Sequence, residues 1–586
     1  MYNQWSLDAL YSGFEDNKFK EDLKKADDFC ERFRIFACQL EKEDIKTTLI
    51  HALQLMEEHH LLMKKLLNFC SLKHSVNTSD SASLSYMGRL MQKLSDVQKP
   101  LTSIQRFISE IPNLETILGK DPFLLEYRDY LLRIQDSARH LLNEDTEEAL
   151  ARMKVSGGQA WSDLQSCLTS SVEVNYCDEK TTLSSIRNLA YSPDAQTRKE
   201  AYEAELDCYG KIKDSVAYAL NSIKLQDLSE CGMRGFSSPL DKVLFHSRME
   251  RSTLHALLEA MKEYLPNFHS YLRAKAEALG HQNGLPWYDL FAPMGDSSKE
   301  YTAEEAKTYL LDIFARSNPK MAEITKQAFD EKWIDFYPRN GKVGGAFCEG
   351  LTAQKQFRIL TNFGGAFGDV ITLAHELGHG YHDFMIFDNR PLNTEYSMPV
   401  AETASTFNEN LAVNFAIEHA ANDQEKLALI EQQLSDTTQI ICDIYSRFLF
   451  ESRVVEKRSK NFLPAEELCQ IMTEAQKEAY GNGLDPEFLH PYMWICKPHY
   501  YSAELGFYNF PYAFGGLFAR GLYEKYKQEG SAFLEKYNLM LKETPVCSVE
   551  DAAKICGIDL TKKDFWLMSL HSFDELISEF KRLTSR

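Results

Sequence analysis

Apolar residues recur at helical spacing through most of the first third of the chain. The clearest run, with charged residues between its apolar positions, is Leu23, Ala26, Cys30, Phe33, Ala37 and Leu40. The stretch 45–69 repeats the pattern, and a polar loop at 75–83 precedes more helical periodicity that continues to about residue 168. It is interrupted near Gly157 and Gly158. This pattern predicts a helical N-terminal lobe with almost no strands.

Serine and proline cluster between residues 184 and 193, and helical patterns resume over 197–228 and 253–279. No long flexible linker separates the two parts, so we expect them to pack together. A chain of 586 residues is expected to form two or three domains, and the sequence predicts an N-terminal helical domain over 1–190 and a second domain over 191–586.

The helical pattern ends before the segment 341–368, where glycines are frequent. Residues 356–363 alternate with a period of two, which predicts a β-strand. Gly364 and Gly365 end it, and Asp369 is placed to cap the following helix.

Composition narrows the class of protein. Hydrophobic residues make up 44% and charged residues 26%, as in a globular domain. The net charge of -21 disfavours nucleic acid and anionic membranes as partners. No secretory leader, no apolar run long enough to span a bilayer and no C-x-x-C pair among the 13 cysteines is visible. We expect a cytoplasmic protein without an obligate protein partner.

The helix that follows the predicted strand carries His375-Glu-Leu-Gly-His379. Residues four apart lie only about 40° apart around a helix, so the imidazoles of His375 and His379 can converge on one ion. Glu376 is rotated by about 100° and can reach a water at that ion. Zinc suits this set because it accepts imidazole and carboxylate ligands tetrahedrally and keeps one position for water in catalytic sites.

A third ligand must come from farther along the chain. Positions 385 and 398, where two other zinc-peptidase spacings would place a ligand, are methionines. Glu395 lies in a polar loop, whereas Glu402 begins a strong helical run, so Glu402 is the preferred ligand. Glu409 lies nearly two turns later on the same face; it is either a hydrogen-bond partner that orients a ligand histidine or a solvated helix residue.

The metal motif followed by Val400-Ala-Glu-Thr-Ala-Ser-Thr-Phe-Asn-Glu409 resembles the oligoendopeptidase F group of M3 metallopeptidases. Segments 5–11, 141–161, 288–293 and 344–346 are similar to other parts of that family, so the resemblance covers most of the chain. It implies a mainly α, two-lobed, zincin-type fold with a deep central channel and a small β-sheet beside the active-site helix. It also implies one Zn²⁺ per chain and short unfolded peptides as substrates.

An aromatic cluster over 497–515 would by itself indicate core packing. The resemblance implies that His499 and Tyr508 face the zinc and that Tyr512 is a further substrate contact. Tyr501 competes with Tyr508 for the tyrosine role and is retained as a second substrate contact.

These residues predict a zinc metalloendopeptidase that cleaves internal bonds of short oligopeptides. Glu376 is the expected general base, and Tyr508 with His499 is expected to stabilise the oxyanion. The edge of strand 356–363 and the flexible pair Gly344 and Gly345 are expected to contact the peptide backbone.

Two other functions remain open. One is an exopeptidase of similar fold, such as a dipeptidyl carboxypeptidase. The other is a non-catalytic peptide-binding protein with a structural zinc, against which the presence of Glu376 argues. Cys348 and Cys496 lie near site segments, where inert buried thiols are the default interpretation.

Overall fold

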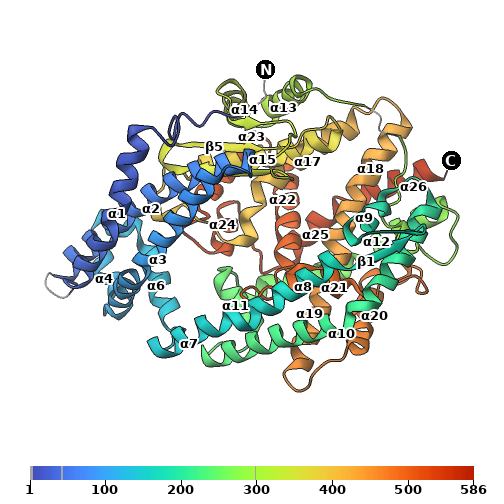
Figure 1. Ribbon diagram of the computed structural model, residues 1–586. Helices are drawn as coiled ribbons and strands as arrows, with labels where there is room; N and C mark the ends of the chain where they lie inside the picture. The colour runs from blue at the N-terminus through green and yellow to red at the C-terminus, as the bar shows by residue number, and fades with distance from the viewer. Residues whose placement is uncertain (1–3, 41–43, 120, 297–298, 586) are drawn as a thin grey trace.

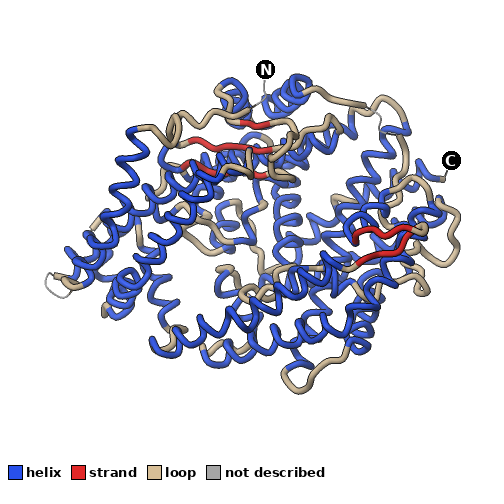
Figure 2. Tube along the Cα trace, in the orientation of Figure 1, coloured by secondary structure: helices blue, strands red, loops and turns tan. Residues whose placement is uncertain are grey.

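The computed structural model describes residues 4–40, 44–119, 121–296 and 299–585, and most of them are helical (Figures 1 and 2). The long helices α2 (Ile45–Val76), α3 (Ser81–Glu110) and α10 (Ala195–Met233) each follow an aspartate whose carboxylate accepts a backbone N–H of the first turn. Short-range sequence signals thus set where these helices begin. The remaining helices of the N-terminal third are α1 (Asn17–Ala37), α4 (Leu114–Leu118), α5 (Pro122–Glu126), α6 (Arg128–Ala138), α7 (Glu144–Lys154), α8 (Ala160–Ser171) and α9 (Leu183–Asn188).

The glycine pair near 157 interrupts the helical pattern as the sequence indicates. A π-helical turn at Val155–Gln159 joins α7 to α8, and Gly157 leaves the helical region of backbone space there. One element of this third was not predicted. A two-stranded antiparallel hairpin, β1 (Glu173–Tyr176) and β2 (Glu179–Thr182), follows α8. It is hard to read from the sequence because Val174 is its only buried residue, and its turn depends on positive φ angles at Cys177 and Asp178.

A small sheet of three strands lies beside the metal helix, as expected. Its strands are β3 (Ile334–Asp335), β4 (Phe347–Leu351) and β5 (Gln356–Leu360), in the order β3-β5-β4. The predicted strand is therefore β5, but it is central, parallel to β3 and antiparallel to β4. The expectation that its edge pairs with a peptide is wrong, because both of its edges are already paired. The outer strands of this sheet are β4 and the two-residue β3.

The C-terminal two thirds pack around one large apolar core that extends from residue 243 to residue 580. Its central helices are α12 (Arg251–Ala278), α15 (Phe367–Ile386), α17 (Thr403–Glu418) and α22 (Phe510–Glu529). The others of this part are α11 (Pro239–His246), α13 (Ala303–Ser317), α14 (Pro319–Asp330), α16 (Met398–Ala401), α18 (Asp423–Thr438), α19 (Ile444–Arg458), α20 (Ala465–Tyr480), α21 (Met493–Cys496), α23 (Ser531–Glu543), α24 (Val549–Ile555), α25 (Lys563–His571) and α26 (Asp574–Thr584).

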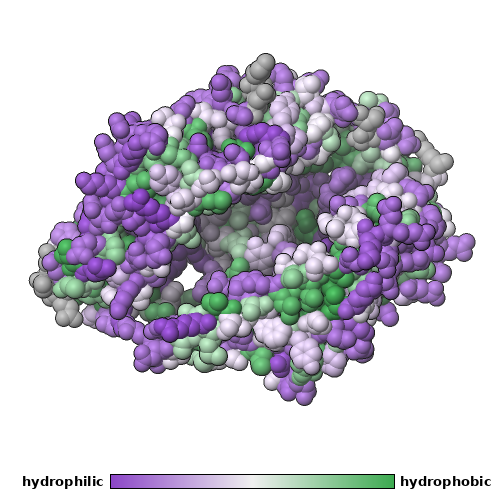
Figure 3. Space-filling view, viewed as in Figure 1, coloured by the Kyte–Doolittle hydropathy of each residue, from purple (hydrophilic) through white to green (hydrophobic). Residues whose placement is uncertain are grey.

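The molecule is hollowed at its centre. In the space-filling view the hollow lies between an upper half, which carries α15 and α17, and a lower half, which carries α8 and α10 (Figures 1 and 3). The expected mainly helical, two-lobed fold with a central channel and a small sheet is confirmed. Among the described helices, none combines the length and apolarity needed to cross a bilayer.

Candidate functional site

Helix α15 begins immediately after β5 because two local features turn the chain. Gly365 has φ +102°, a conformation that favours glycine, and its carbonyl accepts the N–H of Tyr301 at 2.7 Å. The Asp369 carboxylate accepts the backbone N–H groups of Gly364 and Ala366, each at 3.0 Å. Asp369 therefore caps α15 from inside its first turn and not from the preceding position.

Two glycines let α15 approach its neighbours closely. A Cβ at Gly378 would lie 2.5 Å from the carbonyl oxygen of Ala404, and a Cβ at Gly380 would lie 2.7 Å from the ring of Phe357. Only glycine fits where the α15 backbone touches the start of α17 on one side and β5 on the other. This close approach brings the segment that contains Glu402 within reach of the two histidines.

The three predicted metal ligands meet. The Nε2 atoms of His375 and His379 lie 3.1 Å apart, and Oε2 of Glu402 lies 3.3 and 3.4 Å from them. Ligands about 2.0–2.2 Å from a tetrahedral zinc are about 3.3–3.6 Å apart, so this triangle has nearly the size that zinc requires. Within the described chain it is the group of histidine, cysteine and carboxylate side chains identified as able to hold a metal.

The sequence context suggested that Glu402 begins a continuous helix, but the structure differs. Glu402 occupies the break between α16 and α17, with φ -88° and ψ 9°. Ser405 donates a hydrogen bond from Oγ to Glu402 Oε2 at 2.8 Å and fixes the carboxylate. The sequence analysis does not identify Ser405, although serine commonly forms short-range hydrogen bonds of this kind near the start of a helix.

Glu409 accepts a hydrogen bond from His375 Nδ1 at 2.6 Å. With the proton held on Nδ1, Nε2 presents its lone pair toward His379 and Glu402. Burial opposes charging the His375 imidazole, but the hydrogen bonds to Glu402 and Glu409 outweigh it and raise the pKa of His375 to about 10. The same imidazoles keep the pKa of Glu402 well below its usual range, although its burial works in the opposite direction. Donors and acceptors at this point are therefore arranged for a cation.

Replacing Glu409 by glutamine should weaken zinc binding by about 10–100-fold, because the neutral amide holds the His375 ring less firmly. Competition with a chromogenic chelator measures the affinity. Glu418→Gln, an exposed change at the end of the same helix, is the matched control. Equal zinc affinities for the two variants would show that Glu409 is an ordinary solvated residue.

Glu376 is 6% exposed and has no hydrogen-bond or ion-pair partner among the described residues. It lines a cavity of about 640 Å³ together with His375, His379 and Glu402. Burial raises the pKa of its carboxyl group, and the two histidines only partly offset this. An unpartnered carboxylate beside the three ligand atoms is free to exchange a proton with a molecule in the cavity.

Residues 346–350, which include most of β4, form another part of the same cavity lining. The nearby pair Gly344 and Gly345 lies in the loop before β4, and Asn362 fixes that loop by donating to the carbonyl of Gly345 at 2.8 Å. Cys348 lies on β4 in this lining, and burial raises the pKa of its thiol well above the usual range. A peptide strand in the cavity would therefore meet the edge of β4 and not the edge of β5.

An aromatic group from the C-terminal part stands near the metal ligands. His499 stacks on Tyr508 with ring centroids 5.3 Å apart, and its Nε2 lies 3.3 Å from the Tyr512 hydroxyl. Tyr512 lies one turn before Gly515 on α22, and a Cβ at Gly515 would lie 3.2 Å from Cβ of Glu402. The helix face that carries Tyr512 thus borders the metal ligand Glu402.

Tyr508 is positioned by a buried ion pair that the sequence did not reveal. The preceding residue, Phe507, has a left-handed backbone with φ 51°, and its N–H donates to Oε1 of Glu451 at 2.9 Å. Lys224 Nζ lies 2.5 Å from the same oxygen, and both charged side chains are at most 2% exposed. The pair links α10, α19 and the loop that presents Tyr508.

The prediction of Tyr501 as a substrate contact does not fit the structure. Tyr501 is 1% exposed, and its hydroxyl donates to the carbonyl of Trp494 at 2.9 Å. A buried side chain with an occupied hydroxyl has no group to offer a peptide. Tyr512, at 41% exposure, and Tyr508 are the tyrosines that remain.

Comparisons with known proteins cover nearly all of the chain. The sequence pattern described as "Peptidase family M3" matches residues 188–572, and that described as "Oligopeptidase F" matches residues 112–173. Oligopeptidase PepF of Bacillus subtilis is 24% identical over 91% of this chain and 81% of its own length. Group B oligopeptidase PepB of Streptococcus agalactiae is 25% identical over 82% and 79%.

Solved structures share the fold. A candidate peptidase from Chlamydophila abortus superposes with a TM-score of 0.84 at 20% identity, covering all of this chain and 98% of the other. Oligoendopeptidase-F from Enterococcus faecium gives a TM-score of 0.70 at 19% identity, covering 97% and 99%. At these identities the likeness establishes the architecture.

Proposed function

The chain belongs to peptidase family M3, and we propose that it is a zinc-dependent metalloendopeptidase that hydrolyses internal bonds of short oligopeptides. The observation that carries this proposal is the triangle of His375, His379 and Glu402 ligand atoms with Glu376 beside it in one cavity. His375, His379 and Glu402 would hold one zinc ion per chain. When bound, zinc supplies Lewis acidity that polarises a carbonyl and lowers the pKa of water to about 7.

Glu376 accepts the proton of the attacking water and delivers it to the leaving amine. Its raised pKa suits a group that must take up and release a proton in one cycle. Its burial also keeps competing solvent away from the carboxylate. This role needs an open cavity beside the ligands, which a purely structural metal site would lack.

Tyr508 and His499 donate hydrogen bonds to the negative charge that develops on the scissile carbonyl oxygen. Burial, together with the nearby cations of Arg447 and Lys497, lowers the pKa of His499 to about 4, so its imidazole is neutral near pH 7. A neutral ring donates from one nitrogen only. The Tyr512 hydroxyl, 3.3 Å from His499 Nε2, restrains the orientation of that ring.

The edge of β4 offers backbone N–H and C=O groups to an extended peptide. Pairing of this kind reads the shape of a strand more than its sequence, which favours broad cleavage specificity. The molecule is hollowed between its two halves (Figure 3), and a hollow of this kind suits an unfolded segment better than a folded domain. Short peptides are therefore the proposed substrates.

Tyr508→Phe should lower kcat by about 10²–10³-fold with little change in KM, because the lost hydroxyl acts on charge that forms only in the transition state. Steady-state kinetics on a quenched peptide measures both constants. Tyr501→Phe is the matched control; it removes a buried hydroxyl away from the cavity, costs about 0.5–1.5 kcal/mol of stability and leaves kcat unchanged. A larger loss of kcat in Tyr501→Phe than in Tyr508→Phe would reverse the assignment.

Two further proposals concern the whole chain. The division into domains over 1–190 and 191–586 is supported by family patterns that end at residue 173 and resume at residue 188. A reducing, cytoplasmic location is supported by the state of the thirteen cysteines, all of which are described and free. Cleavage of a peptide blocked at both ends tests the endopeptidase proposal against the exopeptidase alternative.

A further inference from the structure

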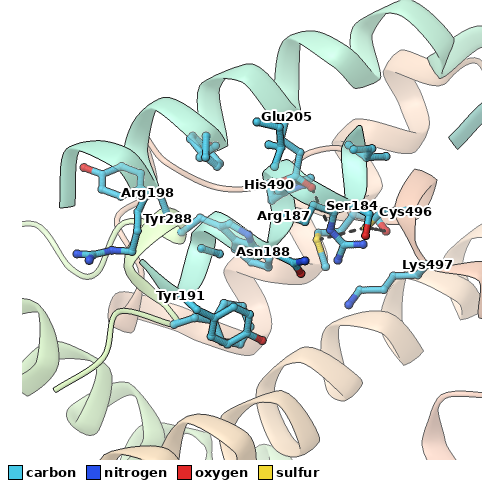
Figure 4. A pocket seen from close by; sticks show the side chains of 18 of the residues that line it. Ser184, Arg187, Asn188, Tyr191, Arg198, Glu205, Tyr288, His490, Cys496 and Lys497 are labelled. Carbon is cyan, nitrogen blue, oxygen red and sulfur yellow. Dashed lines mark hydrogen bonds and ion pairs between the residues drawn. The ribbon is translucent and has the colours of Figure 1, made fainter. Parts of the chain in front are cut away.

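A second cavity, of about 590 Å³, is lined in part by α8 and α10 of the lower half (Figures 1 and 4). It is formed by α8, α9, α10, the loop around Trp287, the end of α18 and the segment after α21. The side chains of Arg187, Asn188 and Lys497 extend toward the same part of it (Figure 4). Arg187 and Asn188 come from α9, whereas Lys497 follows α21 about 310 positions later in the chain.

The cationic side chains of this cavity differ in whether a carboxylate lies beside them. Arg187 lies 3.3 Å from Glu205 Oε1, and Arg198 lies 2.8 Å from Asp289, so both guanidinium groups have carboxylate partners. Lys497 has no hydrogen-bond or ion-pair partner among the described residues, although it is partly buried. Burial lowers the pKa of this ammonium group and outweighs the opposing charge of Asp443, so an anion in direct contact with Lys497 would offset the cost of its burial.

Other polar lining groups do not satisfy Lys497. Asp436 lines the cavity and accepts a hydrogen bond from Gln432 at 2.9 Å. His490 is 1% exposed; its Nε2 lies 3.4 Å from Glu205, and its Nδ1 is buried without a partner. Lys497 thus makes no ion pair with any of these groups, and a carboxylate placed between it, Arg187 and Asn188 could accept charge-assisted hydrogen bonds from all three.

Two observations relate this cavity to the metal site. Lys497 precedes His499 by two residues, so their Cα atoms lie at most about 7 Å apart. On another wall, Asp436 lies close enough to Glu409, the hydrogen-bond partner of His375, to interact with it electrostatically. A peptide held at the metal ligands can therefore extend a few residues into this cavity.

We propose that this cavity binds a carboxylate carried by the peptide substrate, with Lys497 as its ion-pair partner and Arg187 and Asn188 as additional donors. The inference rests on the proposed function, because it assumes that a peptide occupies the adjacent metal site. Charge-assisted hydrogen bonds of this kind favour one part of the substrate over another without contacting the scissile bond. Lys497 is thus a specificity-determining residue.

Binding of labelled peptides to the zinc-loaded Glu376→Gln protein, which should not turn them over, tests the proposal. Three heptapeptides with an N-terminal fluorophore are compared by anisotropy: one with a free C-terminus and neutral side chains, the same peptide amidated, and an amidated peptide with one glutamate near its C-terminus. We expect at least one of the two peptides with a carboxylate to bind about tenfold more tightly than the neutral amide. The peptide that gains affinity identifies the terminal or the side-chain carboxylate as the source.

Lys497→Met should remove that advantage, while Lys497→Arg should retain it. Lys24→Met, the same change at an exposed position on α1, is the matched control. Ser184→Glu adds a carboxylate at an exposed position of the lining without removing any packing, and should also abolish the advantage. Equal binding of all three peptides, or an advantage that survives both Lys497→Met and Ser184→Glu, would overturn the proposal. The test measures peptide binding and not turnover. An inactive wild-type protein would therefore contradict the proposed function, but the binding data would still test the carboxylate site.

Discussion

Replacing Glu376 by glutamine is expected to lower kcat by about 10²–10⁴-fold while one zinc ion per chain stays bound. The glutamine fills the same space, so the packing of α15 is preserved. It cannot accept a proton, however, and the water at the site loses its base. The three ligand atoms belong to other residues, which is why the metal should remain.

Elemental analysis measures whether zinc is retained, and steady-state rates on one peptide measure the loss of kcat. Rate loss with zinc retained assigns Glu376 to the chemistry. A glutamine variant that hydrolyses peptides near the wild-type rate would refute the proposed mechanism. A variant that loses zinc as well would show that Glu376 supports the metal site and would leave the base unassigned.

Replacing His379 by alanine should abolish both zinc binding and hydrolysis. Removing a ligand breaks the triangle itself, so the loss of zinc affinity should exceed the roughly 10–100-fold expected from a supporting hydrogen bond such as that of Glu409. Zinc that binds the folded chain raises its Tm, and this rise should disappear in the variant.

Thermal unfolding with and without added zinc measures the effect. His255→Ala, an exposed change on α12, should keep the full zinc-dependent rise in Tm. If His379→Ala bound zinc with unchanged affinity, the metal would lie elsewhere, and the proposed centre would be wrong.

Local sequence was sufficient for the metal helix. The spacing of His375 and His379 fixes their relative direction as soon as a helix forms, and the strand and glycine turn before it indicate where that helix begins. The sequence identified Glu402 as a ligand because a helical run surrounds it. It did not indicate that Glu402 occupies a break between two helices, α16 and α17. That break lies where α17 packs on α15 and α16 packs on α22, contacts that join residues far apart in the chain.

Features that depend on long-range pairing could not be predicted. The position of β5 in the sheet is set by two partners, neither of which alternates clearly in sequence. The choice between Tyr501 and Tyr508 depends on long-range contacts. The Tyr501 hydroxyl is buried against the carbonyl of Trp494, whereas the loop that presents Tyr508 is held by the Lys224–Glu451 pair. The cavity between Arg187 and Lys497 joins segments with no local pattern in common.

The central claim is tested most directly by an internally quenched nonapeptide blocked at both ends, incubated at saturating concentration with chelator-treated protein and increasing zinc. The account predicts internal cleavage that is absent in the metal-free protein and reaches its maximum at one zinc per chain. An intact blocked peptide in the presence of zinc-loaded protein that still shortens its free-ended counterpart would contradict the endopeptidase assignment and identify an exopeptidase.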